Sequence, residues 1–592
     1  MFIKKKTKIA VLLALIILLG MRLCMMYSLR VSHMLDEAYS YGFANNPGEP
    51  WFIHEGITED GIKELVHYGK WYSGSEFVDF LVVNEGEQFD FVSVIQNKLE
   101  DTSPSNFEII LHFVCSFFPG KFSWDYAFAV NLIFYIGTLI LLYHIVCLIF
   151  EKDKYSHIYA YLCMIFFSFT ICGTGAFTFL RMYGILSFYA LLDLFLIMKI
   201  STCKGKKIFI YGIALCLSSF FGFFTHFNFL IYAFGLTLFS CISLMLGRKF
   251  KEMLVGGLSQ LLSVVLFFII YPFPFGRADT WMADENADSF SYFTRLGFSN
   301  MHMFGESIGF YIPFSVASII QAIGRIVLVL IIVLLMFFLF RKENWFISAK
   351  ERMFGGLRVF GGKLKNIVKE SCPILPVIFL TAVFYMLVVN AIAPIMTTKG
   401  YVTRYFFIGM HLVIISFISL LIIVFKNLVN KKIISVPAIL IICVVLLYNQ
   451  NVNYGNPFIL NIPFDDDEVM RDFTDGKDVM IFSSDVRDLY SLIVPLRDVN
   501  SFYFSLANDE GVRTAELPQG DFYVMADKDS FPDEQVNGSG LGGYNPVGGV
   551  GGSIYDYISD RLIPDGSREI VFVRDYNSYA GEYGVYLVKQ AP

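Results

Sequence analysis

The stretch "KKKTKIAVLLALIILLGMRLCMMYSLRVSHMLDEAYSYGFANN" (residues 4–46) joins a basic cluster, a long apolar run and an acidic pair. About 20 apolar residues in a helix cross a hydrocarbon core roughly 30 Å thick, so the run near residues 9–28 predicts a transmembrane helix. No small-residue cleavage site follows it, which favours a retained helix over a signal peptide. Asp36 and Glu37 then stand where the chain leaves the membrane, although one acidic pair alone is also typical of a solvated loop.

The rest of the chain has the same apolar character. Hydrophobic residues make up 55% of its 592 residues and charged residues only 17%, a composition far from that of soluble proteins. About eleven runs are long enough to span a membrane, near residues 9–28, 125–150, 155–174, 176–198, 207–224, 227–246, 254–273, 312–340, 373–394, 403–425 and 433–450. We therefore predict a polytopic α-helical membrane protein with about eleven transmembrane helices.

The loop charges predict its orientation, because Lys and Arg accumulate on the cytoplasmic side. Basic segments at 4–8, 199–207, 247–251, 341–370 and 426–432 alternate with loops that contain few positive residues. This pattern predicts a multi-pass protein of the cell membrane with a cytoplasmic amino terminus. Eleven crossings would leave the carboxyl terminus outside, where 24 acidic and 10 basic residues follow residue 451.

These crossings predict two domains. Residues 1–450 would form the membrane core, with a first outer loop at 29–124, a second large outer loop at 274–311 and a cytoplasmic loop at 341–370. Within the first loop, "FEIILHFVCSFF" (107–118) is too short to span and suits a helix at the membrane interface.

Residues 452–592 would form a soluble extracytoplasmic domain of α/β or α+β type. Short apolar runs separated by turn-rich segments predict strands there, at "DVMIFSS" (478–484), "DFYVMAD" (521–527), "EIVFVRDY" (569–576) and "GVYLVKQ" (584–590). None of the ten Cys lies in this region, so disulfides do not build it.

Five ionisable residues fall on the predicted outer side although up to 368 positions separate them. Asp36 and Glu37 follow the first run, and Arg181 lies near the outer end of the fourth. His226 occupies the turn between the fifth and sixth runs, and Arg404 opens the tenth. Each has a simpler explanation by itself, since an Arg at a helix end can reach headgroups and a lone His can be a packing residue.

Together the five residues suggest one kind of chemistry. Guanidinium groups bind phosphate with two parallel hydrogen bonds and remain charged, and a neighbouring carboxylate can take the proton of an incoming hydroxyl. The set therefore indicates group transfer from a phosphate-bearing donor that resides in the membrane.

Several motifs resemble the C-type glycosyltransferase (GT-C) superfamily, in particular protein O-mannosyltransferases and lipid A aminoarabinose transferases. The similar segments are "LDEAYSYGFA" (35–44), "PSNFEIILHFVCSFFPG" (104–120, without the opening His-Pro-Pro), "RMYGILSFYALL" (181–192), "FTHFNFLIYAF" (224–234) and "RYFF" (404–407). The resemblance covers residues 1–450 and extends to no segment beyond them.

The resemblance implies a bacterial cell-envelope enzyme that moves a sugar from a polyprenyl-phosphate donor to an acceptor hydroxyl with inversion. Asp36 would be the general base, and Glu37 would orient the acceptor or support Asp36. Arg181 and Arg404 would hold the donor phosphate, with His226 as a further phosphate contact. The acceptor would be a glycan, a lipid or a protein, and no nucleic acid is expected.

The resemblance requires no cofactor. An Asp-Glu pair could bind a divalent metal, but the arginines would already compensate the phosphate charge.

Two other functional classes would need different features. A transporter or flippase for a lipid-linked glycan would place ionisable groups near the bilayer midplane. The central stretches of the runs offer little ionisable chemistry, and the main exception, Asp193, falls near the inner end of its run. A non-catalytic assembly or sensor subunit would not need the Asp-Glu pair and both arginines.

Overall fold

The computed structural model describes residues 5–57, 63–99, 101, 104–271, 307–308, 374–392, 404–428, 432–453, 465–508, 515–531, 553–564, 566–578 and 581–590. The chain folds into two compact units, each assembled from separated segments. The helical unit comprises Met1–Leu23, Phe134–Phe177 and Tyr183–Phe458. The mixed unit comprises Cys24–Ile133, Thr178–Met182 and Ile459–Pro592.

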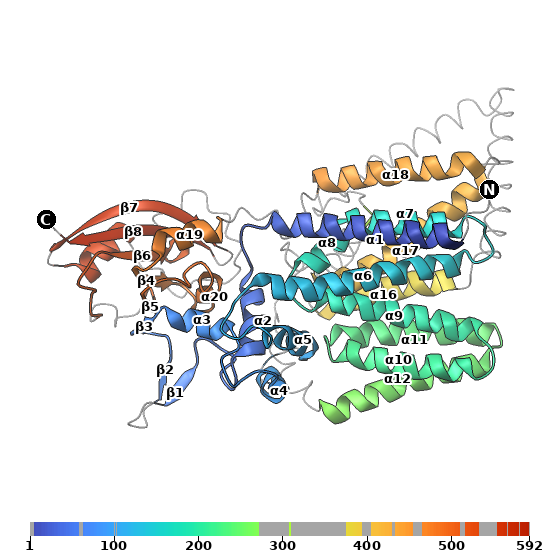
Figure 1. Ribbon diagram of the computed structural model, residues 1–592, viewed down its shortest axis with the longest axis horizontal. Coiled ribbons are helices and arrows are strands. Elements are labelled where there is room, and N and C mark those ends of the chain that lie inside the picture. Colours follow the sequence, from blue (N-terminus) through green and yellow to red (C-terminus); the bar gives the residue numbers. More distant parts are fainter. Residues whose placement is uncertain are drawn as a thin grey trace, which may run out of the picture. The chain divides into compact units, whose positions relative to one another are not determined.

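Long apolar helices build the helical unit (Figure 1). They are α1 (Lys5–Ser28), α6 (Trp124–Ile149), α7 (Ser156–Phe169), α8 (Ile171–Thr178), α9 (Tyr183–Thr202), α10 (Lys207–Phe223), α11 (Asn228–Leu246), α12 (Phe250–Ile270), α16 (Ile374–Ile392), α17 (Phe407–Leu428) and α18 (Lys432–Asn453). Helices α1 and α6 continue into the mixed unit, since the division falls within both.

Six helices among the described residues are long and apolar enough to cross a membrane, and the number is seven if the bent pair α7 and α8 forms one span. Helices α10, α16 and α18 are apolar over shorter stretches. The helices thus indicate a multi-pass membrane protein, whereas the predicted count of about eleven is not confirmed. The predicted run at 312–340 lies outside the described residues.

The bend between α7 and α8 corrects the expected boundary between the third and fourth runs. The helices meet at 64°, and Thr170 between them has an extended backbone with ψ 154°. A Cβ on Gly173 would lie 2.0 Å from the carbonyl oxygen of Phe167, so a larger residue would clash with this turn. The sequence pattern missed the bend because the apolar run continues through it.

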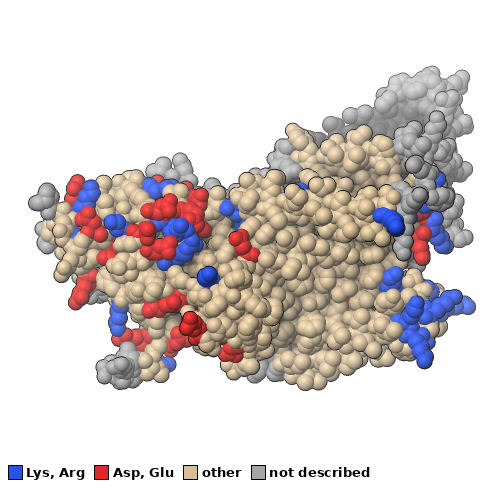
Figure 2. Space-filling model, in the orientation of Figure 1, with Lys and Arg blue, Asp and Glu red and all other residues tan. Residues whose placement is uncertain are grey.

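Charge is sparse along the sides of the long helices. Figure 2 shows a broad tan surface on the helical unit, with Lys and Arg side chains gathered near helix ends. Such a surface suits hydrocarbon, in which an exposed charge is costly.

Short helices from the first predicted outer loop open the mixed unit. They are α2 (Leu35–Asn45), α3 (Ser75–Leu81), α4 (Phe91–Leu99) and α5 (Asn106–Cys115). Helix α2 packs against the other three and also against α20 (Leu489–Leu492) from the carboxy-terminal region. The helix expected at 107–118 is present as α5, and its interfacial location stays a prediction.

A six-stranded sheet forms the rest of the mixed unit, with the order β3-β5-β4-β6-β8-β7. Its strands are β3 (Trp71–Ser73), β4 (Asp478–Ser483), β5 (Ser501–Leu506), β6 (Phe522–Asp527), β7 (Arg568–Asn577) and β8 (Glu582–Gln590). Strands β5, β4 and β6 are parallel, and the outer strands run antiparallel to their neighbours. The central strands are almost wholly buried, as expected for parallel strands covered on both faces.

The remaining short elements are β1 (Glu55–Ile57) and β2 (Lys63–Leu65), which pair with each other, and α19 (Asp467–Thr474), η4 (Val486–Asp488), η6 (Lys528–Ser530), α21 (Ile554–Tyr557) and η8 (Ile558–Leu562). Aromatic and aliphatic side chains from β4, β6, β8 and α21 form the core of the sheet region. The four predicted strands are all present as β4, β6, β7 and β8, and β5 and β3 were not predicted.

The expected domain boundary at residues 450–452 needs a correction. Strand β3 of the first loop pairs with β5, with Trp71 opposite Tyr503. Farther along, the amide of Asp467 donates a hydrogen bond of 3.0 Å to the carbonyl of Val31. The first loop and the carboxy-terminal region therefore make one unit, because backbone pairing and a shared core join them.

The second outer loop expected at 274–311 lies outside the described residues apart from 307–308, and so does the cytoplasmic loop expected at 341–370.

Candidate functional site

Glu37 lies at the centre of a buried polar cluster in the mixed unit. Its side chain is fully buried, and so is that of Arg30, which donates to both carboxylate oxygens at 2.9 and 2.6 Å. The amide of Met34 donates to Glu37 at 2.8 Å, so the carboxylate caps the start of α2 and suits the positive end of the helix dipole.

The same cluster attaches the segment 178–182 to α2. Arg30 donates to the carbonyl of Thr178 at 2.7 Å, and the amide of Leu180 donates to Glu37 at 2.7 Å. Four hydrogen bonds thus occupy the Glu37 carboxylate. The sequence interpretation has Glu37 orient the acceptor or support Asp36, and in the structure this carboxylate joins two chain segments next to Asp36.

Arg181 lies directly beside Asp36. One guanidinium nitrogen donates to the Asp36 carbonyl oxygen at 2.7 Å and to the Ser40 hydroxyl at 2.9 Å. Arg181 is 9% exposed, and Asp36 is half-buried. Two of the sequence-predicted residues, 145 positions apart, therefore meet at the first turns of α2.

A buried chain of polar groups continues behind Arg181. The Ser40 hydroxyl donates to Glu108 of α5 at 3.4 Å, and the Lys98 ammonium of α4 approaches the same carboxylate oxygen at 3.4 Å. Lys98 also pairs with Asp101. Glu108 and Lys98 are almost completely buried, so this chain holds the Ser40 hydroxyl that contacts Arg181.

The carboxy-terminal region contacts α2 one helical turn after Asp36. The Tyr39 ring, one helical turn after Asp36, lies 4.3 Å from that of Tyr490 in α20. The Tyr490 hydroxyl accepts from the amide of Ile53 at 3.4 Å. Burial raises the pKa of Tyr39 well above its ordinary value, and the nearby Tyr490 and Asp36 raise it further.

His226 and Arg404 belong to the helical unit, where both lie against Tyr405. The ring centroids of His226 and Tyr405 are 6.0 Å apart, and the Arg404 guanidinium is 5.1 Å from the Tyr405 ring. The His226 ring accepts from the amide of Asn228 at 3.0 Å at the start of α11. The Tyr183 ring also belongs to this group, with its centroid 5.9 Å from that of His226.

Sequence reasoning missed several residues of these clusters. Arg30 was detectable as a positive residue on the predicted outer side, where few are expected. Glu108 was detectable as an acidic residue in an apolar helix. Ser40 and Tyr490 carry no such signal, because only the packing of α2 gives them a role.

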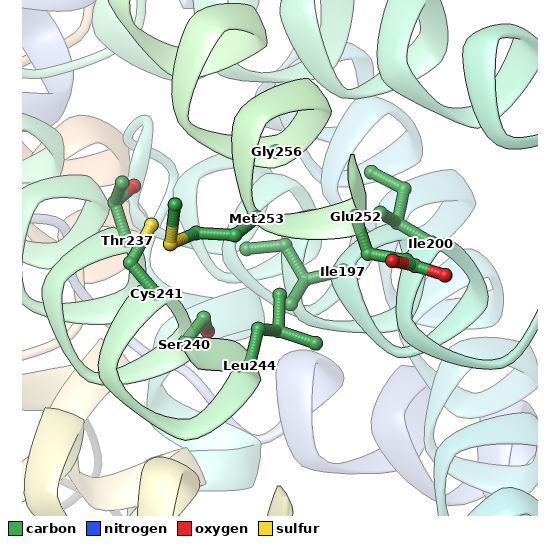
Figure 3. Close-up of a pocket in the computed structure, with 9 residues that line it drawn as sticks. All are labelled: Ile197, Ile200, Thr237, Ser240, Cys241, Leu244, Glu252, Met253 and Gly256. Atoms are coloured by element: carbon green, nitrogen blue, oxygen red, sulfur yellow. The ribbon is translucent and has the colours of Figure 1, made fainter. Parts of the chain in front are cut away.

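The structure also has a pocket in the helical unit (Figure 3). Its lining comes from α9, α11 and α12 and is mainly apolar, with Thr237, Ser240 and Glu252 as the polar members. None of its nine lining residues is cationic, so this pocket is unsuited to a phosphate.

No arrangement of three or more His, Cys, Asp or Glu residues that could hold a metal ion occurs in the described parts of the chain. No protein-family model matches the sequence, and no curated protein matches it.

Proposed function

We propose that the chain is a GT-C-like glycosyltransferase that moves a sugar from a polyprenyl-phosphate donor to an acceptor hydroxyl on the outer face of the membrane. The observation that carries the proposal is the contact of Arg181 with the first turns of α2, 2.7 Å from the Asp36 carbonyl. It brings a guanidinium that can bind phosphate to the backbone of Asp36, a half-buried residue whose carboxylate can serve as a base.

The proposed reaction is a single displacement. The acceptor oxygen forms a bond to the anomeric carbon, and its proton passes to the Asp36 carboxylate. The bond between the anomeric carbon and the phosphate oxygen breaks, so polyprenyl phosphate leaves with an added negative charge. Arg181 stabilises that charge, and attack opposite the leaving group inverts the configuration at the anomeric carbon.

Glu37 has a positioning role in this proposal. Its hydrogen bonds to Arg30 and to the amide of Leu180 hold the segment that carries Arg181 against α2. The GT-C resemblance assigns Arg404 and His226 to the donor phosphate as well, and that assignment rests on the sequence.

The acceptor side is assigned to Tyr39 and the neighbouring carboxy-terminal segment. Tyr39 and Trp51 are partly exposed, with ring centroids 5.4 Å apart. The guanidinium of half-exposed Arg487 donates a hydrogen bond of 2.9 Å to the Asp485 carboxylate. Aromatic faces beside charged groups suit an acceptor rich in hydroxyls, which would give the carboxy-terminal region a part in acceptor choice.

Transfer assays with membranes that contain the full chain test the proposal. Asp36→Asn should lower the rate of sugar transfer from a panel of polyprenyl-phosphate sugars by about 10²–10⁴-fold, the usual contribution of a general base. Arg181→Lys, which keeps the charge and loses the planar fork, should weaken donor use. The exposed Glu85 of the same loop offers a matched control as Glu85→Gln, which should transfer normally.

Two results would refute these roles. Full transfer by a normally expressed Asp36→Asn protein would remove Asp36 as the base. Unchanged donor affinity and rate in Arg181→Lys and Arg181→Ala would remove the phosphate contact.

A second candidate function is a transporter or flippase of a lipid-linked glycan. The observation in its favour is Asp193, which is fully buried near the middle of α9. Purified protein that moves labelled lipid-linked glycan across vesicles without forming a glycosidic bond would support this alternative over transfer.

A further inference from the structure

Asp193 is an acidic residue in the interior of an apolar helix. It lies near the middle of α9, one of the candidate membrane spans, and is 0% exposed. Charged groups at such depth are costly and usually face a partner or an ion pathway. The proposed transferase chemistry does not use it.

Polar side chains from two neighbouring helices converge on the Asp193 carboxylate. The Ser219 hydroxyl of α10 donates to Oδ2 at 2.6 Å, and the Gln260 amide of α12 donates to the same oxygen at 3.2 Å. The Ser218 hydroxyl faces this carboxylate as well. Ser218 and Ser219 lie in the second half of α10 and Gln260 near the middle of α12, so all the groups are well inside the helices.

Three oxygen atoms of this group are buried without a hydrogen-bond partner of ordinary geometry. They are Oδ1 of Asp193, Oε1 of Gln260 and Oγ of Ser218. Unsatisfied buried polar atoms are rare in native proteins and call for an explanation, such as an unseen water or ion. Here they belong to one cluster.

The charge of the cluster indicates which kind of ligand it needs. Among the described residues, no Lys, Arg or His forms an ion pair with Asp193. The three buried atoms without a hydrogen-bond partner are all oxygens, which hard cations prefer. A single carboxylate balances a single positive charge, so a monovalent cation leaves the cluster neutral.

We propose that Asp193, Ser218, Ser219 and Gln260 form an intramembrane binding site for a monovalent cation such as Na⁺. The carboxylate supplies the charge, and the hydroxyl and amide oxygens complete the coordination. The bound ion joins α9, α10 and α12, which pack against one another. Occupancy of the site therefore stabilises this part of the helical unit, independently of the proposed glycosyl transfer.

The test is the thermal unfolding of the full-length protein in detergent, in NaCl or in choline chloride at equal ionic strength. A ligand that binds only the folded state stabilises it by a free energy that grows with the logarithm of the ligand concentration once that concentration exceeds the dissociation constant. Na⁺ should therefore raise the unfolding temperature by a few degrees, and radioactive Na⁺ should bind in a saturable way. Asp193→Asn, which keeps the shape of the side chain, should lose both effects.

Control variants separate ion binding from general damage. The Ser263 hydroxyl donates to the carbonyl of Gln260 in its own helix, so Ser263→Ala should keep the Na⁺ response. Ser218→Ala removes one proposed ligand without touching the carboxylate and should weaken Na⁺ binding several-fold, which keeps the site testable if Asp193→Asn fails to fold.

Equal unfolding temperatures of the wild-type protein in the two salts, with no saturable Na⁺ binding, would overturn the proposal and identify Asp193 as a neutral, hydrogen-bonded carboxyl group.

Discussion

At the residue scale, the two adjacent acids of the first loop have different environments. Glu37 has hydrogen bonds to Arg30, Met34 and Leu180 and is fully buried, whereas Asp36 is half-buried. A carboxylate already occupied by four donors is a poor general base, because proton uptake would break those bonds. The environment of each residue therefore favours Asp36 as the base and Glu37 as the anchor.

Loss of the Glu37 anchor should destabilise the mixed unit. Removing one partner of a buried ion pair leaves an uncompensated charge and typically costs about 3–5 kcal/mol. We expect Glu37→Gln to lower the unfolding temperature clearly, as measured by calorimetry on the purified protein. Lys63→Ala removes an exposed ion pair with Glu55 and should change the unfolding temperature little. Equal unfolding temperatures of the Glu37→Gln and Lys63→Ala variants would contradict the anchoring role of Glu37.

Asp488 should make the stability of the mixed unit depend on pH. Burial raises the pKa of Asp488 to about 7, opposed by a hydrogen bond from Ser483 and assisted by the nearby Asp527 and Asp485. Its ordinary value is 3.8. Between pH 3.8 and about pH 7, the Asp488 carboxyl group keeps a proton in the folded protein that it has lost in the unfolded chain.

Stability should therefore fall as pH rises through this window and level off above it, by up to roughly 4 kcal/mol. Unfolding measured across the window should show a flatter profile for Asp488→Asn, with a relative gain in stability at the alkaline end. Asp560, which is exposed on the same unit, provides the control as Asp560→Asn. An unchanged slope in Asp488→Asn would assign the pH dependence to other groups.

At the element scale, short segments from distant parts of the sequence make the sheet. Strand β3 has only three residues, too few to be recognised by alternation. It pairs with β5 in the register Trp71 opposite Tyr503 and Ser73 opposite Ser501. Strand pairing of this kind depends on which edge of a sheet is available, and that edge exists only after the carboxy-terminal strands have assembled.

The register of β3 and β5 can be tested by a disulfide. Residues directly opposite on antiparallel strands have Cβ atoms about 4.5–5.5 Å apart, so Ser73→Cys with Ser501→Cys should cross-link under mild oxidation. After proteolysis between the two positions, the fragments should separate only on reduction. Ser73→Cys with Asp521→Cys should not cross-link, because Asp521 precedes β6, three strand spacings or roughly 14 Å away.

At the scale of the whole molecule, the two units do not follow the order of the chain. The mixed unit contains the first loop, the segment 178–182 and the carboxy-terminal region. Long apolar helices separate these segments along the sequence. The candidate base and the carboxy-terminal sheet thus belong to one folded body.

This composition predicts that the carboxy-terminal region cannot fold alone. A fragment of residues 459–592 would lack β3 and the contacts of α20 with α2. We expect this fragment to show poorly dispersed amide resonances and to be degraded rapidly by protease. Addition of a second polypeptide with residues 24–133 should increase its protection. A stable, well-dispersed isolated fragment would show that the first loop is dispensable for the sheet.

The sequence alone determined the membrane character of the chain and the presence of four of the six sheet strands, and it singled out Asp36 and Arg181, which the structure brings into contact. These features depend on apolar length, short alternating runs and charges in unusual places, all of which are local in sequence. Tertiary structure decided the bend at Thr170, the pairing of β3 with β5, the anchor role of Glu37 and the polar groups around Asp193. Each of these depends on contacts between residues far apart in the chain, and packing brings such residues together without leaving a periodic signal in the sequence.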